Sequence, residues 1–335
     1  SRLDTFSKCE FSYHCKYVLR LKEQKKPDFR TADTGNFVHM LLERFLTYAT
    51  KSGELRTDID DAEINETVNN LTDEYIRNIF IDPRAVPVRL SVLLERIRRT
   101  SVILIKNILR EFADSDFRPA FFEMSVSDGS DGAEPYTVHL PDGGTVKLRG
   151  RLDRIDTYKR GNDVYIRIVD YKTGNHELSV RRIEHGQDMQ MLLYLFALWK
   201  TNDKKLIERL GAQNGQLLPA GAQYYIAKSP SIVSSGDESE SELEESAVAS
   251  VKRNGLYNSD PEIIRAMSRS GQKFYSPSNL IALDEFGRLL GVIEDNIAKT
   301  AEQMKTGSAR AQWNARYGTE CSYCPMRAVC RKERE

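Results

Sequence analysis

The segment KLRGRLDRIDTYKRGNDVYIRIVDYK, residues 147–172, organises the rest of the chain. It contains two extended runs that meet at the hydrophilic segment 159–163. Gly161 and Asn162 in that segment are typical turn residues. The stretch therefore predicts a β-hairpin with its turn at residues 159–163.

Charged side chains interrupt the apolar pattern of this hairpin. In the second run alternate residues share one apolar face (Val164, Ile166 and Ile168). Asp170 and Lys172 continue that face, and buried charges need a partner such as a metal ion. Pairing of the two runs would bring Asp153 close to Asp170, and two carboxylates suit a hard cation such as Mg²⁺. Lys172, roughly 7 Å further along the strand, would meet an anion held by that metal. The alternative is a surface hairpin with a salt-bridged Asp and Lys.

Composition indicates a soluble globular protein. The 335 residues are 40% hydrophobic and 29% charged, with 49 basic and 49 acidic side chains. A nucleic-acid enzyme of zero net charge needs locally basic surface. The basic candidates are segments 16–30, 149–154, 181–182 and 327–334, which the acidic run 237–245 offsets. Each charged run alone is equally consistent with a solvated surface.

Targeting signals are not visible in the sequence. The longest apolar run, residues 192–199, is far too short to cross a bilayer, so we expect no membrane partner. No signal peptide is visible, and we expect a cytoplasmic protein. The sequence starts with a motif already under way, which predicts a fragment of a longer protein.

Local patterns predict helices, then a compact mixed sheet, then helices again. Helices are expected at residues 35–48, 61–79, 88–112, 187–199, 261–267 and 276–305. Strands are expected at 120–126, 136–140, 146–157, 164–172 and 222–227. The Ser/Glu/Asp-rich segment 229–248 is expected to be a mobile excursion. This order predicts an α/β fold with helical additions.

Asp153…Asp170-Tyr171-Lys172 resembles the core of the PD-(D/E)XK nucleases. The strings G-R-L-D-R-I-D and V-D-Y-K-T-G are similar to the RecB-type branch of that family. The resemblance implies a mixed sheet flanked by helices. His39, in G-N-F-V-H-M-L-L-E, matches a family helix whose histidine helps to hold the catalytic metal; otherwise it is an ordinary helix histidine. Glu123 in P-A-F-F-E stands where the family places an acidic residue near the metal.

Gln190 and Tyr194 resemble the Q-x-x-x-Y motif of the same branch. The resemblance implies that Gln190 orients the lysine or a water, and that Tyr194 contacts a phosphate or a stacked base. The alternative is a core tyrosine beside an exposed glutamine.

Cys321, Cys324 and Cys330 have the spacing C-x2-C-x5-C. Three thiols so close together favour a metal site over disulfides. A structural site needs four ligands, and the fourth must be Cys9 or Cys15 from the other end of the chain. Spacing decides neither between these two cysteines nor between Zn²⁺ and a [4Fe–4S] cluster.

The cysteines and the opening S-R-L-D-T-F-S-K-C-E-F resemble AddB/RexB-type nuclease domains, which have one cysteine before the core and three after it. The resemblance favours Cys9 as fourth ligand, leaves Cys15 free, and favours iron–sulfur. Segment 255–267 is similar to the helical insert of the family. We therefore expect one nuclease domain: a helical part (1–115), a catalytic core (116–228), an acidic loop with a helical insert (229–310) and a cysteine segment (311–335).

The resemblance implies a metal-dependent DNA nuclease, expected to be an exonuclease on single-stranded DNA, that works with an AddA-like helicase–nuclease partner in double-strand break processing. Mg²⁺ or Mn²⁺ would be held by His39, Asp153 and Asp170. The catalytic set is expected to be Glu123, Asp153, Asp170, Lys172, Gln190 and Tyr194. The alternative is a catalytically silent module with a nuclease-like fold that binds DNA or a partner.

Overall fold

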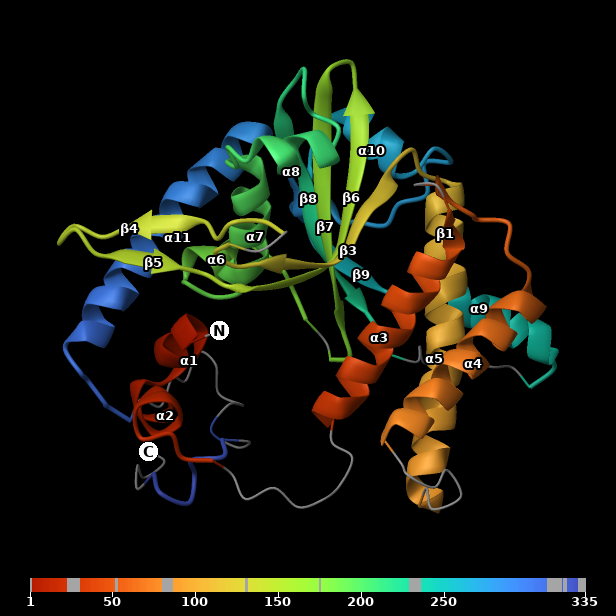
Figure 1. The fold of residues 1–335 in the computed structure, drawn as a ribbon, viewed down its shortest axis with the longest axis horizontal. Helices are drawn as coiled ribbons and strands as arrows, with labels where there is room; N and C mark the ends of the chain where they lie inside the picture. Colours follow the sequence, from red (N-terminus) through yellow and green to blue (C-terminus); the bar gives the residue numbers. More distant parts are fainter. Residues whose placement is uncertain are drawn as a thin grey trace.

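A six-stranded mixed sheet forms the centre of the computed structural model (Figure 1). The structure describes residues 2–22, 31–51, 54–79, 87–129, 132–174, 176–228, 236–311, 321 and 324–330. The strands are β3 (Arg118–Val126), β6 (Gly150–Arg160), β7 (Asp163–Lys172), β8 (Leu217–Ile226), β9 (Arg253–Asn258) and β10 (Leu280–Ile281), in the order β10-β9-β8-β7-β6-β3. Two short hairpins stand apart from this sheet, β1 (Thr50–Lys51) with β2 (Glu54–Leu55) and β4 (Thr137–His139) with β5 (Thr145–Lys147).

The predicted hairpin is confirmed as the β6–β7 pair. Its turn contains Gly161 at φ +61°, a left-handed conformation that glycine adopts without steric cost. β7 then pairs with β8 in parallel. Parallel neighbours need a crossover, and here it consists of α6 (Val180–Glu184), α7 (Met189–Trp199) and α8 (Lys204–Arg209).

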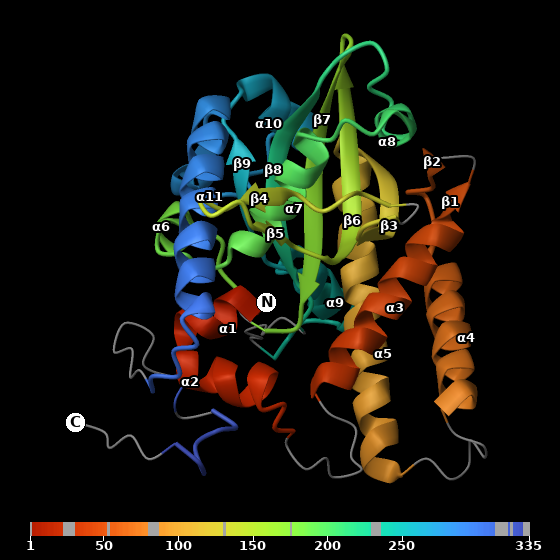
Figure 2. The same cartoon turned by 60° about the vertical axis from the view of Figure 1, so that its left-hand side comes forward.

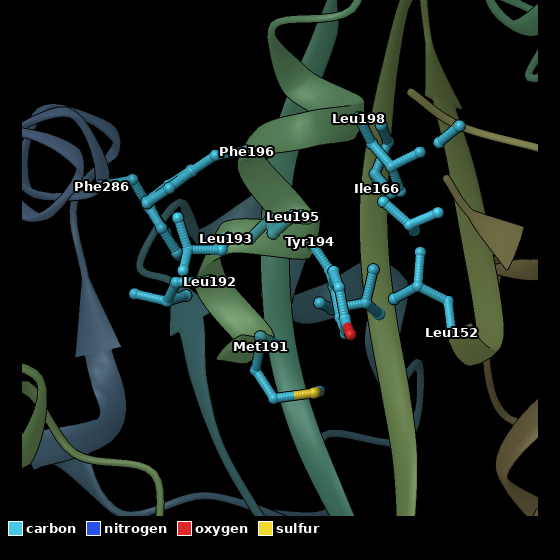
Figure 3. Packing of buried hydrophobic residues seen from close by; sticks show 14 of the residues in the cluster. Leu152, Ile166, Met191, Leu192, Leu193, Tyr194, Leu195, Phe196, Leu198 and Phe286 are labelled. Carbon is cyan, nitrogen blue, oxygen red and sulfur yellow. The ribbon is translucent and has the colours of Figure 1, made fainter. Parts of the chain in front are cut away.

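Helices cover both faces of the sheet (Figure 2). On one face, α7 packs against the aliphatic face of β7, as Figure 3 shows for Tyr194 and Ile166. α11 (Leu283–Lys305) packs on α7, where Phe286 lies beside Phe196. On the other face, α3 (Thr31–Ala49), α4 (Asp61–Ile79) and α5 (Val88–Ala113) enclose Val169 and Tyr171. A third cluster lies under α10 (Pro261–Met267). Both faces of β7 are therefore buried, which matches its nearly continuous apolar sequence.

The two ends of the described chain lie side by side. The N-terminal helices α1 (Arg2–Lys8), α2 (Glu10–Tyr13) and a π-helix (His14–Val18) lie below the sheet in Figure 2, close to the end of α11. The amide of Phe11 donates to the carbonyl of Arg310 at 3.1 Å. The N-terminal helices thus pack against α11 and the segment that directly follows it.

Most predicted elements lie near their expected bounds, and four predictions are corrected. The single strand expected at 146–157 is two strands, β5 in a hairpin with β4 and β6 in the central sheet. Segment 229–248 is not a mobile excursion throughout, because Glu240–Ala249 form helix α9; residues 229–235 lie outside the described part. The helix expected from residue 276 begins at Leu283, after a 3₁₀ turn (Pro277–Asn279) and strand β10. The expected helical insert 255–267 contains part of strand β9 of the central sheet. β9 and β10 extend the sheet beyond the expected core of 116–228.

Within the described residues, no helix is both long enough and apolar enough to cross a membrane.

Candidate active site

Asp153 occupies a point where the regular pairing of β6 with its two neighbours is interrupted. On one side Phe122 pairs with Arg154 and Met124 with Leu152, so Glu123 lies opposite Asp153. On the other side the β6–β7 pairs end at Arg154 with Val169, and the next position would set Asp153 opposite Asp170. The amide of Tyr171 donates to Asp153 Oδ2 at 2.7 Å. The Asp153 side chain therefore accepts the hydrogen bond of an amide that would otherwise continue the β6–β7 ladder.

His39 reaches the same point from helix α3. Its Nδ1 lies 3.3 Å from Asp153 Oδ1, and its Nε2 lies 2.7 Å from the carbonyl oxygen of Tyr171. Burial lowers the pKa of His39, but the hydrogen bond and charge of Asp153 and the Tyr171 carbonyl together hold it above its usual value. The Tyr171 backbone thus contacts both His39 and Asp153.

Glu123 is the third member of the group. It adopts φ +50°, a left-handed conformation that is uncommon for a residue with a side chain and is concentrated at functional sites. Burial raises the pKa of Glu123, and the charges of Asp153 and Glu43 act in the same direction. Arg151, whose guanidinium lies 3.4 Å from the Glu123 carboxylate, opposes them.

Asp170 and Lys172 lie on the next strand and form an ion pair at 2.6 Å. Burial raises the pKa of Asp170 to about 6, and the charge of Asp153 contributes in the same sense. Lys172 and His39 act against this shift. Crowded, partly buried carboxylates of this kind are relieved by a cation.

His39, Glu123 and Asp153 can each direct one ligand atom so that the three atoms lie within 4.8 Å of one another. The carboxylate oxygens of this group suit Mg²⁺ and Mn²⁺, and the single imidazole is its softer ligand. The expected set was His39, Asp153 and Asp170. In the structure Glu123 completes the group of three, because Asp170 is turned toward Lys172.

Tyr194 and Gln190 join the site from helix α7. Gln190 Nε2 donates to the Tyr194 hydroxyl at 2.7 Å, and the charges of Asp170 and Asp153 both act on that hydroxyl. The ring of Tyr194 is 2% exposed and packs in the core with Leu152 (Figure 3), so it is not available to stack on a base. Only its hydroxyl is directed to the polar site.

Gly150, the glycine of the G-R-L-D string, lies against the hydroxyl of Tyr194. A Cβ built at Gly150 would lie 1.7 Å from the Tyr194 hydroxyl oxygen. The missing side chain therefore leaves room for that hydroxyl, a role that the linear sequence did not reveal.

Arg154 and Asp156, in the second half of G-R-L-D-R-I-D, lie on the opposite face of the sheet from the candidate site. Four buried charged residues and the half-buried Arg253 form what we call the ion lattice: Glu111, Arg154, Asp156, Arg167 and Arg253. Arg167 lies 2.7 Å from Asp156 and 2.8 Å from Glu111. Arg154 also donates to the Tyr171 hydroxyl at 3.1 Å, which links the lattice to the residue whose backbone contacts the site.

The cysteines lie near one another without forming a compact ligand group. Burial raises the pKa of Cys15, and the thiols of Cys324, Cys330 and Cys9 raise it further. Among the described residues, no three cysteine sulfurs lie within 4.8 Å of one another. The four-cysteine cluster stays a prediction, and so does the choice of Cys9 over Cys15 as its fourth ligand.

The fold and the site together define the class. A model of the PD-(D/E)XK nuclease superfamily matches residues 1–331, and the chain belongs to this superfamily. Similar proteins include the B subunit of the ATP-dependent helicase/deoxyribonuclease of Thermoanaerobacter sp. (strain X514), 28% identical over 99% of this chain, and that of Clostridium acetobutylicum, also 28% identical over 99%. The corresponding protein of Clostridioides difficile (strain 630) is 27% identical over 98%.

The chain spans only part of these relatives, 30% of the first and 29% of the other two. The predicted resemblance to the RecB-like and AddB-type nucleases and the mixed α/β fold are confirmed. Sequence reasoning placed His39, Asp153, Asp170 and Lys172 together but did not identify Gly150 or the ion lattice. The sequence did contain a signal for the ion lattice, the R-x-D that directly follows Asp153. Charges in a strand that is buried on both faces require partners.

Proposed function

We propose that this chain is a divalent-metal-dependent deoxyribonuclease that hydrolyses phosphodiester bonds of single-stranded DNA. The observation that carries the proposal is the convergence of His39, Glu123 and Asp153 beside the Asp170–Lys172 ion pair. Membership of the nuclease superfamily and the names of the relatives support it.

His39, Asp153 and Asp170 are the proposed ligands of Mg²⁺ or Mn²⁺. Glu123 supplies a further carboxylate, and the Tyr171 carbonyl, which faces His39 Nε2, supplies a neutral oxygen. A bound divalent cation polarises the phosphate and lowers the pKa of water. The donor set of carboxylates, one imidazole and a carbonyl fits either metal.

Lys172 is the proposed electrostatic catalyst. Its ammonium lies beside Asp170 and is 32% exposed, so it can reach a phosphate brought to the carboxylates. There it would stabilise the negative charge that develops on the phosphate oxygens. Gln190 would hold the Tyr194 hydroxyl in position next to these groups.

A metal-dependent cleavage assay tests this assignment. Asp170→Ala and Lys172→Ala should each lower the cleavage of labelled single-stranded DNA by about 10²-fold or more with Mg²⁺ or Mn²⁺. Lys159→Ala, at the exposed far end of the same hairpin, is the matched control and should keep wild-type activity. Circular dichroism would establish that all three variants fold. Undiminished cleavage by the Asp170 or Lys172 variant would reject the proposal.

A silent binding module is the second candidate, because a nuclease-like fold can hold DNA without cutting it. The same assay separates the two. DNA binding by the wild-type chain with no cleavage in either metal would favour the silent module.

We also propose that the chain acts with a second, AddA-like helicase–nuclease protein in the processing of DNA double-strand breaks. The names of the relatives support this, since they describe one subunit of a helicase/deoxyribonuclease. The chain would be the nuclease part, because it spans less than a third of each relative.

The cysteines are proposed to hold a structural [4Fe–4S] cluster through Cys9, Cys321, Cys324 and Cys330, with Zn²⁺ as the alternative. The thiols of Cys9, Cys324 and Cys330 all act to raise the pKa of Cys15, which supports a thiol-rich site at the junction of the two chain ends. Such a donor set suits either group.

A further inference from the structure

A second polar group surrounds Tyr224, immediately beyond the candidate active site. Tyr224 of β8 stands opposite Asp170 of β7 in the parallel register. The ammonium of Lys172 lies 5.8 Å from the centroid of its ring, and the ring of His176 lies 5.5 Å from it. Two side chains that carry N–H donors therefore contact the same tyrosine.

Cations outnumber acids around His176. Burial lowers the pKa of His176, and the positive charges of Lys172, Lys8 and Arg182 lower it further, with Asp188 opposing them. Arg182 comes from α6 and forms an ion pair with Asp188. Positive charges from three separate elements thus act on one histidine.

The hydroxyl of Tyr224 lacks a partner at this place. The residue is only 5% exposed, yet its hydroxyl makes no hydrogen bond to any residue that the structure describes. This hydroxyl is not fully enclosed by protein atoms, so it opens toward solvent. A hydroxyl in this position gains from an oxygen ligand brought by a substrate.

Two backbone features distinguish this place. A Cβ at Gly174 would lie 3.6 Å from His176 Nε2, so the glycine leaves that nitrogen uncovered by a side chain. Asp188, which holds Arg182, adopts φ +52°, a strained conformation for a residue other than glycine. Strain of this kind persists where surrounding structure enforces it, often at functional sites.

We propose that Lys172, His176, Arg182 and the Tyr224 hydroxyl form a second phosphate-binding subsite, which takes the phosphodiester next to the one that is cleaved. The ligand is the backbone of single-stranded DNA, so the inference rests on the proposed function. Guanidinium and imidazole N–H groups are suited to phosphate oxygens. Lys172 lies between the two subsites, because it is also 2.6 Å from Asp170.

Binding without metal tests the subsite separately from cleavage. The affinity of a short fluorescent single-stranded oligonucleotide is measured by anisotropy in EDTA over a range of salt concentrations. Arg182→Gln should weaken binding about 5-fold or more, and the slope of log K against log salt should fall in magnitude by about 0.7. Arg181→Gln, its exposed neighbour on the same helix, is the matched control and should change neither quantity.

Two milder variants test the neutral donors. Tyr224→Phe keeps the ring contacts with Lys172 and His176 but removes the hydroxyl, and should weaken binding roughly 3-fold to 10-fold. His176→Ala should weaken it to a similar extent, whereas His185→Ala at the exposed end of α6 should not.

The outcomes separate the two proposals. Equal affinities for the Arg182→Gln and Arg181→Gln variants in a chain that still cleaves DNA would overturn the subsite alone. A chain that shows the expected binding pattern but never cleaves with Mg²⁺ or Mn²⁺ would overturn the proposed hydrolysis and retain the subsite.

Discussion

Gly150 is the position in this site where even a methyl group has no room. A Cβ there would lie 1.7 Å from the hydroxyl oxygen of Tyr194 and 2.8 Å from its Cζ atom. The tyrosine cannot retreat easily, because its ring is buried in the core and its hydroxyl is bonded to Gln190. The smallest residue therefore determines where the tyrosine hydroxyl lies.

Gly150→Ala should lower the free energy of unfolding by about 1–3 kcal/mol, because it overpacks this contact. It should also lower nuclease activity, because Tyr194 and Gln190 are displaced together. Chemical denaturation and the cleavage assay measure the two effects. Adding Tyr194→Phe should restore part of the lost stability, since the hydroxyl is the closest atom; no recovery in the double variant would contradict this explanation.

Glu111 is the acidic centre of the ion lattice. Burial raises the pKa of Glu111, but the charges of Arg167, Arg253 and Arg154 outweigh burial and bring it to about 2. The folded pKa is thus lower than the usual 4.5, so the stabilisation is complete above pH 4.5 and disappears as the pH falls through 2.

We expect the free energy of unfolding to fall by about 3 kcal/mol between pH 5 and pH 2 through Glu111. Glu111→Gln should be about 3–5 kcal/mol less stable at pH 7, because buried arginines lose their partner, and its stability should depend less on acid. Urea unfolding at several pH values measures both, with the exposed Glu302→Gln as control. An unchanged acid dependence in Glu111→Gln would contradict the assignment.

The candidate site was partly predictable from single residues. Alternation along the strand identified Asp170 and Lys172, because they continue the aliphatic face of Val164 to Ile168. The central place of Glu123 was not predictable, since it depends on a left-handed backbone within β3. Arg154 looked like a surface charge in the sequence, and only packing of α5 against the sheet buries it.

Among the elements, helix α9 shows how an acidic segment becomes ordered. Its Glu244 lies 2.5 Å from Lys106 of α5, a lysine that is only 8% exposed and also pairs with Asp61. Asn107 donates to the Val248 carbonyl at 2.7 Å. The Ser239–Glu242 capping box begins the helix. Long-range charge pairing and a local cap together overcome the low hydrophobicity of this segment.

Glu244 and Glu245 provide a matched pair of tests. Glu244→Gln removes a partner from the nearly buried Lys106 and should lower the protection of α9 amides from hydrogen exchange by about 1–2 kcal/mol. Glu245→Gln breaks a pair with Arg110 that is solvent-exposed on both sides, and should cost less than about 1 kcal/mol. Equal losses in the two variants would show that burial of Lys106 does not strengthen its ion pair with Glu244.

The limits of pattern recognition are also clear at the scale of elements. The helices at 61–79 and 261–267 were predicted with the observed bounds, because amphipathic periodicity or a proline start marks them. Strand β9 was missed because R-N-G-L-Y-N contains Asn and Gly and has little alternation. Its strand conformation is stabilised by the ladder to β8, which is a tertiary interaction.

At the scale of the whole molecule, the two chain ends form one structural unit. Phe11 is hydrogen-bonded to Arg310, and Glu10 contacts Ser308. The thiols of Cys9, Cys324 and Cys330 influence Cys15 in the same region. A metal bound there would close a very long loop, which favours the folded state.

Cys9→Ser should therefore abolish the bound metal and expose both ends to proteolysis, whereas Cys15→Ser should keep the metal. Elemental analysis of anaerobically purified protein gives the metal, and limited trypsin digestion reports on the ends. Iron with visible absorbance would support the cluster, and zinc in a colourless sample would support the alternative. If only Cys15→Ser lost the metal, Cys15 would be the fourth ligand in place of Cys9.

The contact between residues 11 and 310 has a mechanical consequence. A pulling force applied to the chain outside residues 11–310 would act first on this contact. The strands that carry Asp153 and Asp170 would bear load only after the contact has broken.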